Sequence, residues 1–176
     1  MKNIVYIATS LDGYIATSDG SVDWLHEIPN PSGSDYGWSE LMGRIDAIVM
    51  GRNTFETVLS FGQWPYEKPV FVASSSLKEI PAHLEGKVRF IEGTPSEMVS
   101  ELNGQGYENL YIDGGDTIRR FLAEDIIDEI VVTRVPILLG GGHPLFGSLT
   151  EPLKFRHAKT EVFDDILVKS TYLRER

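Results

Sequence analysis

The sequence predicts an α/β fold in which a mixed, mostly parallel central sheet carries helices on both faces and ends in an antiparallel C-terminal hairpin. Between residues 47 and 135, short apolar runs alternate with segments of helical periodicity, an order that implies right-handed crossovers between parallel strands. Near the end of the chain, two strand-like segments, 155–163 and 166–173, flank Asp164-Asp165, which predicts a hairpin. The length of 176 residues suits one domain, and we expect it to span residues 1–176.

The first element is a buried strand over residues 4–10, rich in Ile, Val and Tyr. Leu11-Asp12-Gly13 turns it into a second short extended piece at 14–16. Residues 17–37 are expected to form an irregular loop, which is long for a compact domain and therefore typical of a functional or mobile segment. A helix follows over about 35–44.

Two strand-glycine-helix units occupy the middle of the chain. In the first, a strand at 47–50 ends at Gly51, and Asn53 with Glu56 predicts a capping box for a helix over 54–59. In the second, a strand at 110–112 ends at Gly114 and Gly115, and Asp116 or Thr117 is expected to cap the next helix. Its apolar face holds Ile118, Phe121 and Leu122, while Arg119 and Arg120 point elsewhere.

Three further segments complete the sheet and its helices. A strand at 69–73 ends in three serines, Ser74 to Ser76, and a strand at 88–91 precedes Thr94-Pro95-Ser96-Glu97, which has the pattern of a capped helix start. Residues 130–135 form another strand.

Composition excludes several classes of function. The net charge of -10 argues against a broad nucleic-acid interface, because such an interface needs many cations to meet the phosphates. No apolar run reaches membrane-spanning length. The absence of cysteine excludes disulfides and thiolate metal sites and fits a cytoplasmic location. We expect no metal, since the four histidines are scattered without ligand spacing: His26, His83, His143 and His157.

The predicted ends of three strands offer the parts of a phosphate site. Ligands of parallel α/β sheets bind beyond the carboxyl ends of the strands. Here these ends carry Gly51-Arg52, Ser74-Ser75 and Gly114-Gly115. An arginine binds phosphate bidentately, hydroxyls donate to the same oxygens, and a glycine pair at a helix start exposes backbone N–H groups. A dinucleotide suits this arrangement.

These motifs resemble a known family. VMGRNTFETV, VFVASS and YIDGG resemble the dihydrofolate reductase fold, a three-layer α/β/α arrangement. SLDGYIA, the Asp23-Trp24 pair and PILLGGGHPLF resemble more closely the bacterial reductases grouped with the C-terminal domain of the bifunctional riboflavin biosynthesis deaminase-reductase. The resemblance implies a reductase that uses NADPH, similar to 5-amino-6-(5-phosphoribosylamino)uracil reductase and dihydrofolate reductase, with a small planar heterocycle or carbonyl compound as substrate.

The resemblance also implies roles for individual residues. Arg52, Ser74 and Ser75 would hold the adenosine 2′-phosphate, and Thr54 would lie near the pyrophosphate. The remaining cofactor-binding residues implied in this way are Gly51, Gly114, Gly115, Asp116 and Thr117 along the cofactor, and Ala8, Ile15 and Ala16 beside the nicotinamide. The peptide between Gly114 and Gly115 would be strained or cis, and the protein would be a homodimer that covers the apolar strand 130–139 and the terminal hairpin.

Several residues keep two interpretations. Asp12 and Asp35 are the candidate catalytic carboxylates, but the simpler interpretation of Asp12 is a turn residue and that of Asp35 is a helix N-cap. Trp24, Trp38 and Trp64 either fill the core or wall a planar ring. Two functions therefore remain: an NADPH-dependent oxidoreductase, or a non-catalytic NADP(H)-binding module of the same fold.

Overall fold

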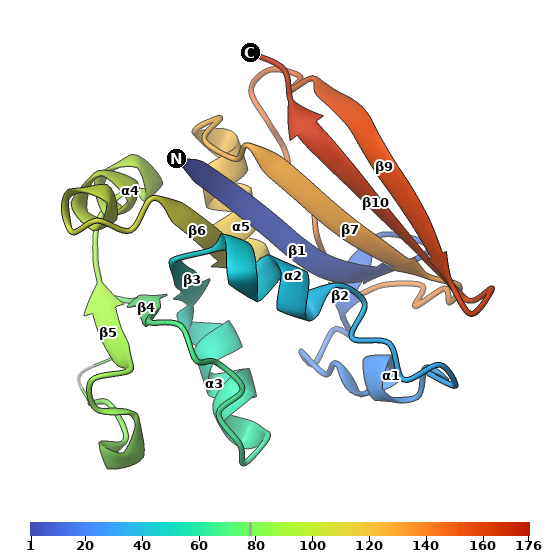
Figure 1. Cartoon of the computed structure of the whole chain (residues 1–176), viewed down its shortest axis with the longest axis horizontal. Helices are drawn as coiled ribbons and strands as arrows, with labels where there is room; N and C mark the ends of the chain where they lie inside the picture. The colour runs from blue at the N-terminus through green and yellow to red at the C-terminus, as the bar shows by residue number, and fades with distance from the viewer. Residues whose placement is uncertain (78) are drawn as a thin grey trace.

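The computed structural model describes residues 1–77 and 79–176, and its centre is an eight-stranded sheet (Figure 1). The strands are β1 (Lys2–Ser10), β2 (Tyr14–Ala16), β3 (Ala47–Gly51), β4 (Val70–Ala73), β5 (Val88–Ile91), β6 (Asn109–Asp113), β7 (Glu129–Val135), β8 (His143–Pro144), β9 (Phe155–Phe163) and β10 (Leu167–Arg174). Their order in the sheet is β5-β4-β3-β6-β1-β7-β10-β9, and β2 pairs with β8 separately. The first six strands of this order run parallel, and β10 pairs antiparallel with both β7 and β9. The predicted mixed sheet with an antiparallel hairpin is confirmed.

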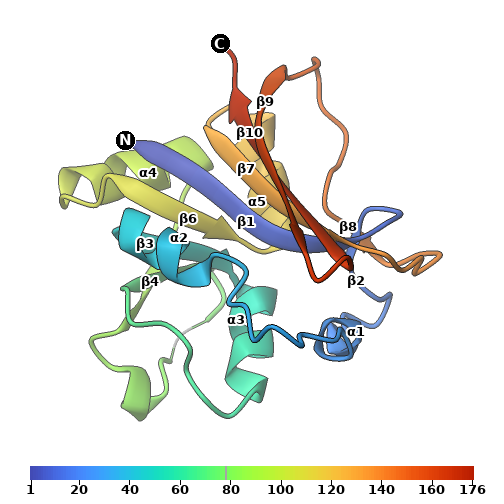
Figure 2. The same ribbon diagram turned by 45° about the vertical axis from the view of Figure 1, so that its right-hand side comes forward.

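Helices cover both faces of the sheet. They are α1 (Asp23–His26), α2 (Trp38–Arg44), α3 (Arg52–Ser60), α4 (Pro95–Gly104) and α5 (Gly115–Ala123), with a short 3₁₀ turn at Ala82–Leu84. Figure 2 shows α2 and α3 on one side of the sheet and α4 and α5 on the other. Of the described helices, none is long and apolar enough to cross a membrane.

Alternate residues of the central strands feed two separate cores. Val5, Val49 and Ile112 pack with α4 and α5, through residues such as Leu102 and Phe121. Their neighbours on the same strands, Ile4, Ile48 and Tyr111, pack with α2 and α3 instead. Because successive side chains of a strand point to opposite faces, a strand buried on both sides reads as one continuous apolar run. The apolar runs seen in the sequence have this origin.

Two local signals in the sequence are confirmed. At the start of α4, the Thr94 hydroxyl accepts from the Glu97 N–H at 3.3 Å and the Glu97 carboxylate accepts from the Thr94 N–H at 2.8 Å, which is the predicted capping box. In the hairpin, Asp164 and Asp165 both have positive φ, 52° and 56°. Positive φ at both central residues is the signature of a type I′ turn, whose twist matches that of the flanking strands.

Other expectations need correction. The loop 17–37 contains one turn of helix, α1, and α2 begins at Trp38 rather than near residue 35. Strand β7 lies inside the sheet between β1 and β10, so the exposed edge on that side is β9. The Gly114–Gly115 peptide is not cis, since every peptide bond placed in the described ranges is trans.

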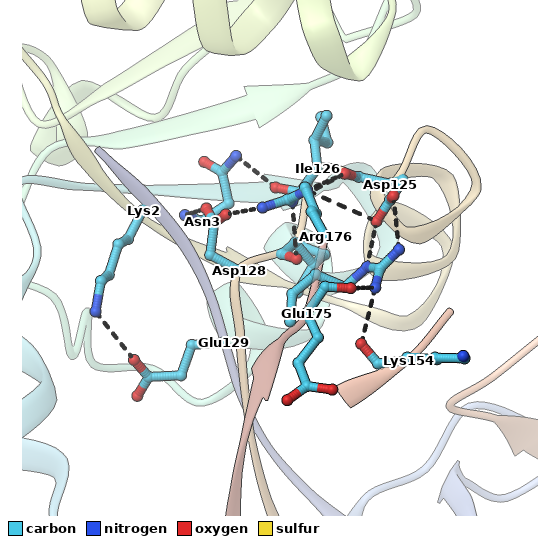
Figure 3. Close-up of polar contacts among 11 residues, drawn as sticks. Lys2, Asn3, Asp125, Ile126, Asp128, Glu129, Lys154, Glu175 and Arg176 are labelled. Atoms are coloured by element: carbon cyan, nitrogen blue, oxygen red, sulfur yellow. Dashed lines mark hydrogen bonds and ion pairs between the residues drawn. The ribbon is translucent and has the colours of Figure 1, made fainter. Parts of the chain in front are cut away.

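Charged side chains fasten the C-terminal residues to the body of the protein (Figure 3). Arg174 forms two hydrogen bonds to the Asp125 carboxylate, at 2.6 and 2.8 Å, and only 9% of its side chain is exposed. Arg176 donates to Asp128 at 2.7 Å, and the other carboxylate oxygen of Asp128 accepts from the backbone N–H of Asn3 at 2.8 Å. The end of β10 is thereby tied to the start of β1 and to the loop before β7.

Candidate active site

The candidate site lies at the carboxyl edge of the sheet, where β3, β4 and β6 end side by side. Gly51 stands opposite Ala73 in the register of β3 and β4, and Met50 stands opposite Asp113 in that of β3 and β6. Helix α3 begins immediately after Gly51, and α5 begins immediately after Gly114. Two helix N-termini therefore meet at the same edge of the sheet.

The glycines permit a very close approach of these two helix starts. A Cβ on Gly51 would lie 2.8 Å from the Thr117 hydroxyl, and one on Gly114 would clash with the Thr54 hydroxyl. Gly114 also has φ 91° and ψ 137°, a backbone conformation that residues other than glycine rarely adopt. The structure thus brings Gly51, Thr54, Gly114 and Thr117 together.

Neither helix start is satisfied by a side-chain cap. The N-cap residue of α3 is Gly51 and that of α5 is Gly114, and neither N-terminus has a side-chain cap hydrogen bond. The predicted capping box of Asn53 and Glu56 is wrong, because α3 starts at Arg52 and Glu56 pairs with that arginine instead. The predicted Asp116 or Thr117 cap is wrong as well, because both residues lie inside α5. Backbone N–H groups of two nine-residue helices are left for another acceptor.

The residues expected beside a nicotinamide come from β1 and β2. A Cβ on Gly115 would lie 2.5 Å from Ile15 Cδ1, so Ile15 packs directly on the α5 start. Ala16 pairs with His143 of β8, and Ala8 stands opposite Thr133 in the register of β1 and β7. Asp116 pairs with Arg119, whose guanidinium also donates to the Pro144 carbonyl.

Beyond β4 and β5 the edge opens into a cleft of about 360 Å³. Arg52 and the serines 74–76 line one part of it, with Ala73 beside them. Arg52 donates to Ser76 Oγ at 3.2 Å and to Glu56 at 2.8 Å, and Ser74 Oγ lies 3.3 Å from Ser76 Oγ. Ile91, Glu92, Gly93, Met98 and Arg120 line the remainder. Arg52, Ser74 and Ser75 thus share one cleft, and its volume suits part of a nucleotide.

Sequence reasoning missed Asp113, the last residue of β6. Its carboxylate accepts from the Gly114 N–H at 2.9 Å and lies 3.5 Å from the Tyr66 hydroxyl. Its surroundings raise the pKa of Asp113 to about 6, because burial disfavours the charged form. Taken as a whole residue, Asp113 is only partly buried. An acidic residue directly before the glycine pair was the only available signal.

The two carboxylates predicted to be catalytic are engaged in local structure. Asp12 accepts from the Ser10 hydroxyl at 2.6 Å and from the N–H groups of Leu139 and Gly140 at 3.1 and 2.8 Å, which ties the turn after β1 to the loop before β8. Asp35 accepts from the N–H groups of Gly37 and Ser39 at the start of α2, and hydrogen bonds from Ser39 and Gly37 lower the pKa of Asp35 to about 2. The contacts of Asp12 match the turn interpretation. The N-cap interpretation of Asp35 is wrong, because the N-cap residue of α2 is Gly37, although Asp35 still accepts from two N–H groups at this helix start.

The three tryptophans pack in or against the hydrophobic cores. Trp24 is buried among Val135 and Leu167, and Trp38 and Trp64 pack against the core on the α2 and α3 side. Trp38 stands within about 6 Å, centroid to centroid, of Tyr6, Tyr66 and Tyr111, the aromatic group around Asp113. Over residues 1–77 and 79–176, no three His, Asp or Glu side chains form a group that would hold a metal ion.

Comparison with known proteins agrees with this architecture. YwjB of Bacillus subtilis, an uncharacterized protein, is 36% identical over 165 residues, which cover 92% of each chain. The 2,5-diamino-6-ribosylamino-4(3H)-pyrimidinone 5′-phosphate reductase of Methanothermobacter thermautotrophicus is 29% identical over 176 residues, covering 78% of this chain and 79% of the relative.

Solved structures show the same fold. A crystal structure of a Shewanella sp. PV-4 protein, assigned provisionally by its name to riboflavin biosynthesis, superimposes with a TM-score of 0.96 at 55% identity over the full length of both chains. Dihydrofolate reductase from Enterococcus faecalis, solved with NADP(H) and RAB-propyl, gives a TM-score of 0.68 at 16% identity, covering 99% of this chain and 97% of that one, which shows the shared fold. The RibD C-terminal domain matches residues 2–169, and the chain therefore belongs to the RibD C-terminal domain family.

Proposed function

We propose that this protein is an NADPH-dependent reductase that transfers a hydride to a small planar heterocycle or carbonyl compound. The observation that carries the proposal is the pair of uncapped helix N-termini, α3 and α5, beside a cleft that contains Arg52 and three serines. Anions bind at helix N-termini and arginine grips phosphate bidentately, so a cofactor with a pyrophosphate and a further phosphate fits this donor set. Membership of the RibD C-terminal domain family, and similarity to a named pyrimidinone phosphate reductase, support the same conclusion.

In this proposal different residues bind different parts of the cofactor. The N–H groups at the starts of α3 and α5, with Thr54, would bind the pyrophosphate, and the cleft would hold the adenosine 2′-phosphate. Ile15, Ala16 and Ala8 would flank the nicotinamide, which supplies the hydride when bound. The protein chiefly orients this donor against its acceptor and keeps water away from both.

Asp113 is our candidate for the proton donor, in place of Asp12 and Asp35. A general acid works best when its pKa lies near the working pH, and the pKa of Asp113 is about 6. Gly114 N–H donates to Asp113 Oδ1, so Oδ2, which lies 3.5 Å from the Tyr66 hydroxyl, is the oxygen proposed to carry the proton. Asp113→Asn should therefore lower turnover while leaving NADPH affinity unchanged.

The test is to titrate the full chain with NADPH while following nicotinamide fluorescence, and then to measure NADPH oxidation with pterin, pyrimidine and quinone acceptors. We expect saturable binding and turnover on at least one acceptor. Binding without turnover on any of them would favour the non-catalytic module, and no binding would refute the nucleotide site altogether.

We also propose a homodimer formed through the terminal hairpin. Val162 and Val168 are opposite each other in the β9 and β10 register and are 59% and 41% exposed, and β9 leaves an edge that another chain can cover. Light scattering at micromolar concentration should give twice the chain mass, and Val162→Lys should shift it to one chain. A single-chain mass for the unmodified protein would contradict this.

A further inference from the structure

The cleft beyond β4 and β5 contains a second cation, Arg120. Arg52 begins α3, which packs on one face of the sheet, and Arg120 belongs to α5, which packs on the other. Both guanidinium groups line the same cleft, so they reach it from opposite faces of the sheet. The amphipathic pattern of α5 placed Arg120 away from the core but did not show where its side chain goes.

The two arginines differ in how far their charge is already neutralised. Arg52 forms an ion pair with Glu56 at 2.8 Å, within its own helix. Arg120 donates to the Gly93 carbonyl at 3.1 Å, and no carboxylate in the part of the chain that the structure describes lies within 4.0 Å of it. A neutral carbonyl leaves the positive charge of Arg120 available to an anion. Arg120 is therefore the cation of the cleft with the larger uncompensated charge.

Glu92, the residue after the end of β5, lines the same cleft and adds a negative charge to it. A carboxylate there repels a bound phosphate, whereas it accepts hydrogen bonds from the free hydroxyls of an unphosphorylated ribose. The balance between Arg120 and Glu92 is thus suited to distinguishing a phosphorylated ribose from an unphosphorylated one.

We infer that Arg120, more than Arg52, is the residue that selects the 2′-phosphorylated adenosine end of the cofactor, with Glu92 opposing it. This inference rests on the proposed function, because it assigns the cleft to the adenosine of NADPH. It predicts that removal of Arg120 weakens binding of a 2′-phosphorylated nucleotide and leaves its unphosphorylated counterpart nearly unchanged. Removal of Glu92 should act in the opposite direction.

The test uses the full chain and two small probes, adenosine 2′,5′-bisphosphate and adenosine 5′-monophosphate, measured by calorimetry. Loss of a charge-assisted hydrogen bond lowers affinity by about 10- to 150-fold. We expect Arg120→Ala to weaken the bisphosphate within this range and to change the monophosphate little. Arg52→Ala should cause a smaller loss, Arg120→Lys should restore part of the affinity, and Glu92→Gln should tighten the bisphosphate.

Arg89→Ala is the matched control, since Arg89 is an exposed arginine of β5 that does not line the cleft and its removal changes the net charge equally. Added salt provides a measurement that does not depend on comparing the stability of variants: it should weaken the bisphosphate more in the unmodified protein than in Arg120→Ala.

Three results would overturn the inference, and they are distinguishable. If Arg120→Ala leaves the bisphosphate affinity unchanged while the unmodified protein binds it, Arg120 does not select the phosphate and the proposed function stands. If Arg120→Ala weakens both probes equally, the guanidinium stacks on the adenine instead. If the unmodified protein binds neither probe, the proposed nucleotide site fails together with the inference.

Discussion

Replacing Asp113 by asparagine should stabilise the protein at neutral pH. Burial raises the pKa of Asp113 from 3.8 to about 6, so the folded protein holds a carboxylate in a site that disfavours its charge. This change in pKa corresponds to about 3 kcal/mol of destabilisation once the group is ionised in both states. Asparagine removes the charge and still offers an oxygen to the Gly114 N–H.

The pH dependence follows from the two protonation states. Well below pH 4 the carboxyl is protonated in the folded and the unfolded chain, so it contributes no pH-dependent difference. Between about pH 4 and 6 the unfolded chain loses the proton while the folded chain retains it, and the unmodified protein loses stability as the pH rises. The stability gap between Asp113→Asn and the unmodified protein should therefore open from near zero at acid pH to about 3 kcal/mol at pH 7.5.

Urea denaturation of both proteins at pH 4.5 and pH 7.5 measures this gap, with Asp165→Asn, a change in the exposed hairpin turn, as control. The variant should also show the loss of turnover expected of a missing proton donor, since functional carboxyls are often held at a cost to stability. A gap that stays the same at the two pH values, or a variant less stable than the unmodified protein at pH 7.5, would refute the reasoning.

Two further predictions concern ion pairs that hold the fold. Arg44→Ala should lower the free energy of unfolding by about 3 kcal/mol, because Glu129 is 4% exposed and loses both hydrogen bonds from Arg44, at 2.9 and 2.6 Å. Among the described residues, the one cation left near Glu129 would be Lys2, at 4.0 Å. Arg44→Ala combined with Glu129→Gln should recover part of the loss in the same urea assay, and no recovery would contradict an electrostatic cause. Arg174→Ala should cost about 1 to 2 kcal/mol, since Asp125 is partly solvent-screened. Arg174 lowers the pKa of Asp125, so this cost should shrink as the pH falls below about 4, and a cost independent of pH would argue for lost packing on Phe155 instead.

Local sequence signals identified those parts of the fold that are stabilised locally. The Thr94 capping box and the Asp164-Asp165 turn form from residues adjacent in sequence, and both match their predicted positions. The Asn53 and Glu56 pair has the spacing of a capping box, but the helix starts two residues earlier than predicted, at Arg52, with Gly51 as its N-cap residue. Spacing alone does not reveal which residue the tertiary structure makes the first of a helix.

The chemistry of the site was less accessible because it depends on contacts between distant segments. In the sequence, Asp113 is at most the polar end of a strand. Its raised pKa comes from burial beside Tyr111 of the same strand and Tyr66, which a distant segment of the chain supplies. Arg120 lies on the polar face of α5, and only the packing of α5 beside the end of β5 brings it to the cleft. Periodicity predicts which side chains avoid the core, not which ligand they meet.

The helices α3, α4 and α5, which follow β3, β5 and β6, differ in how their N-termini are capped. Helix α4 has a complete side-chain cap, whereas α3 and α5, which meet at the candidate site, have none. A cap contributes about 0.5 to 2 kcal/mol, so the two open N-termini leave stability that a bound anion can provide. By mass action, NADPH at a hundred times its dissociation constant should raise the free energy of unfolding by about 2.7 kcal/mol, seen as a higher melting temperature. Adenosine 5′-monophosphate lacks the pyrophosphate and should stabilise less at the same concentration. Equal shifts with the two ligands would mean that the helix starts do not bind the pyrophosphate.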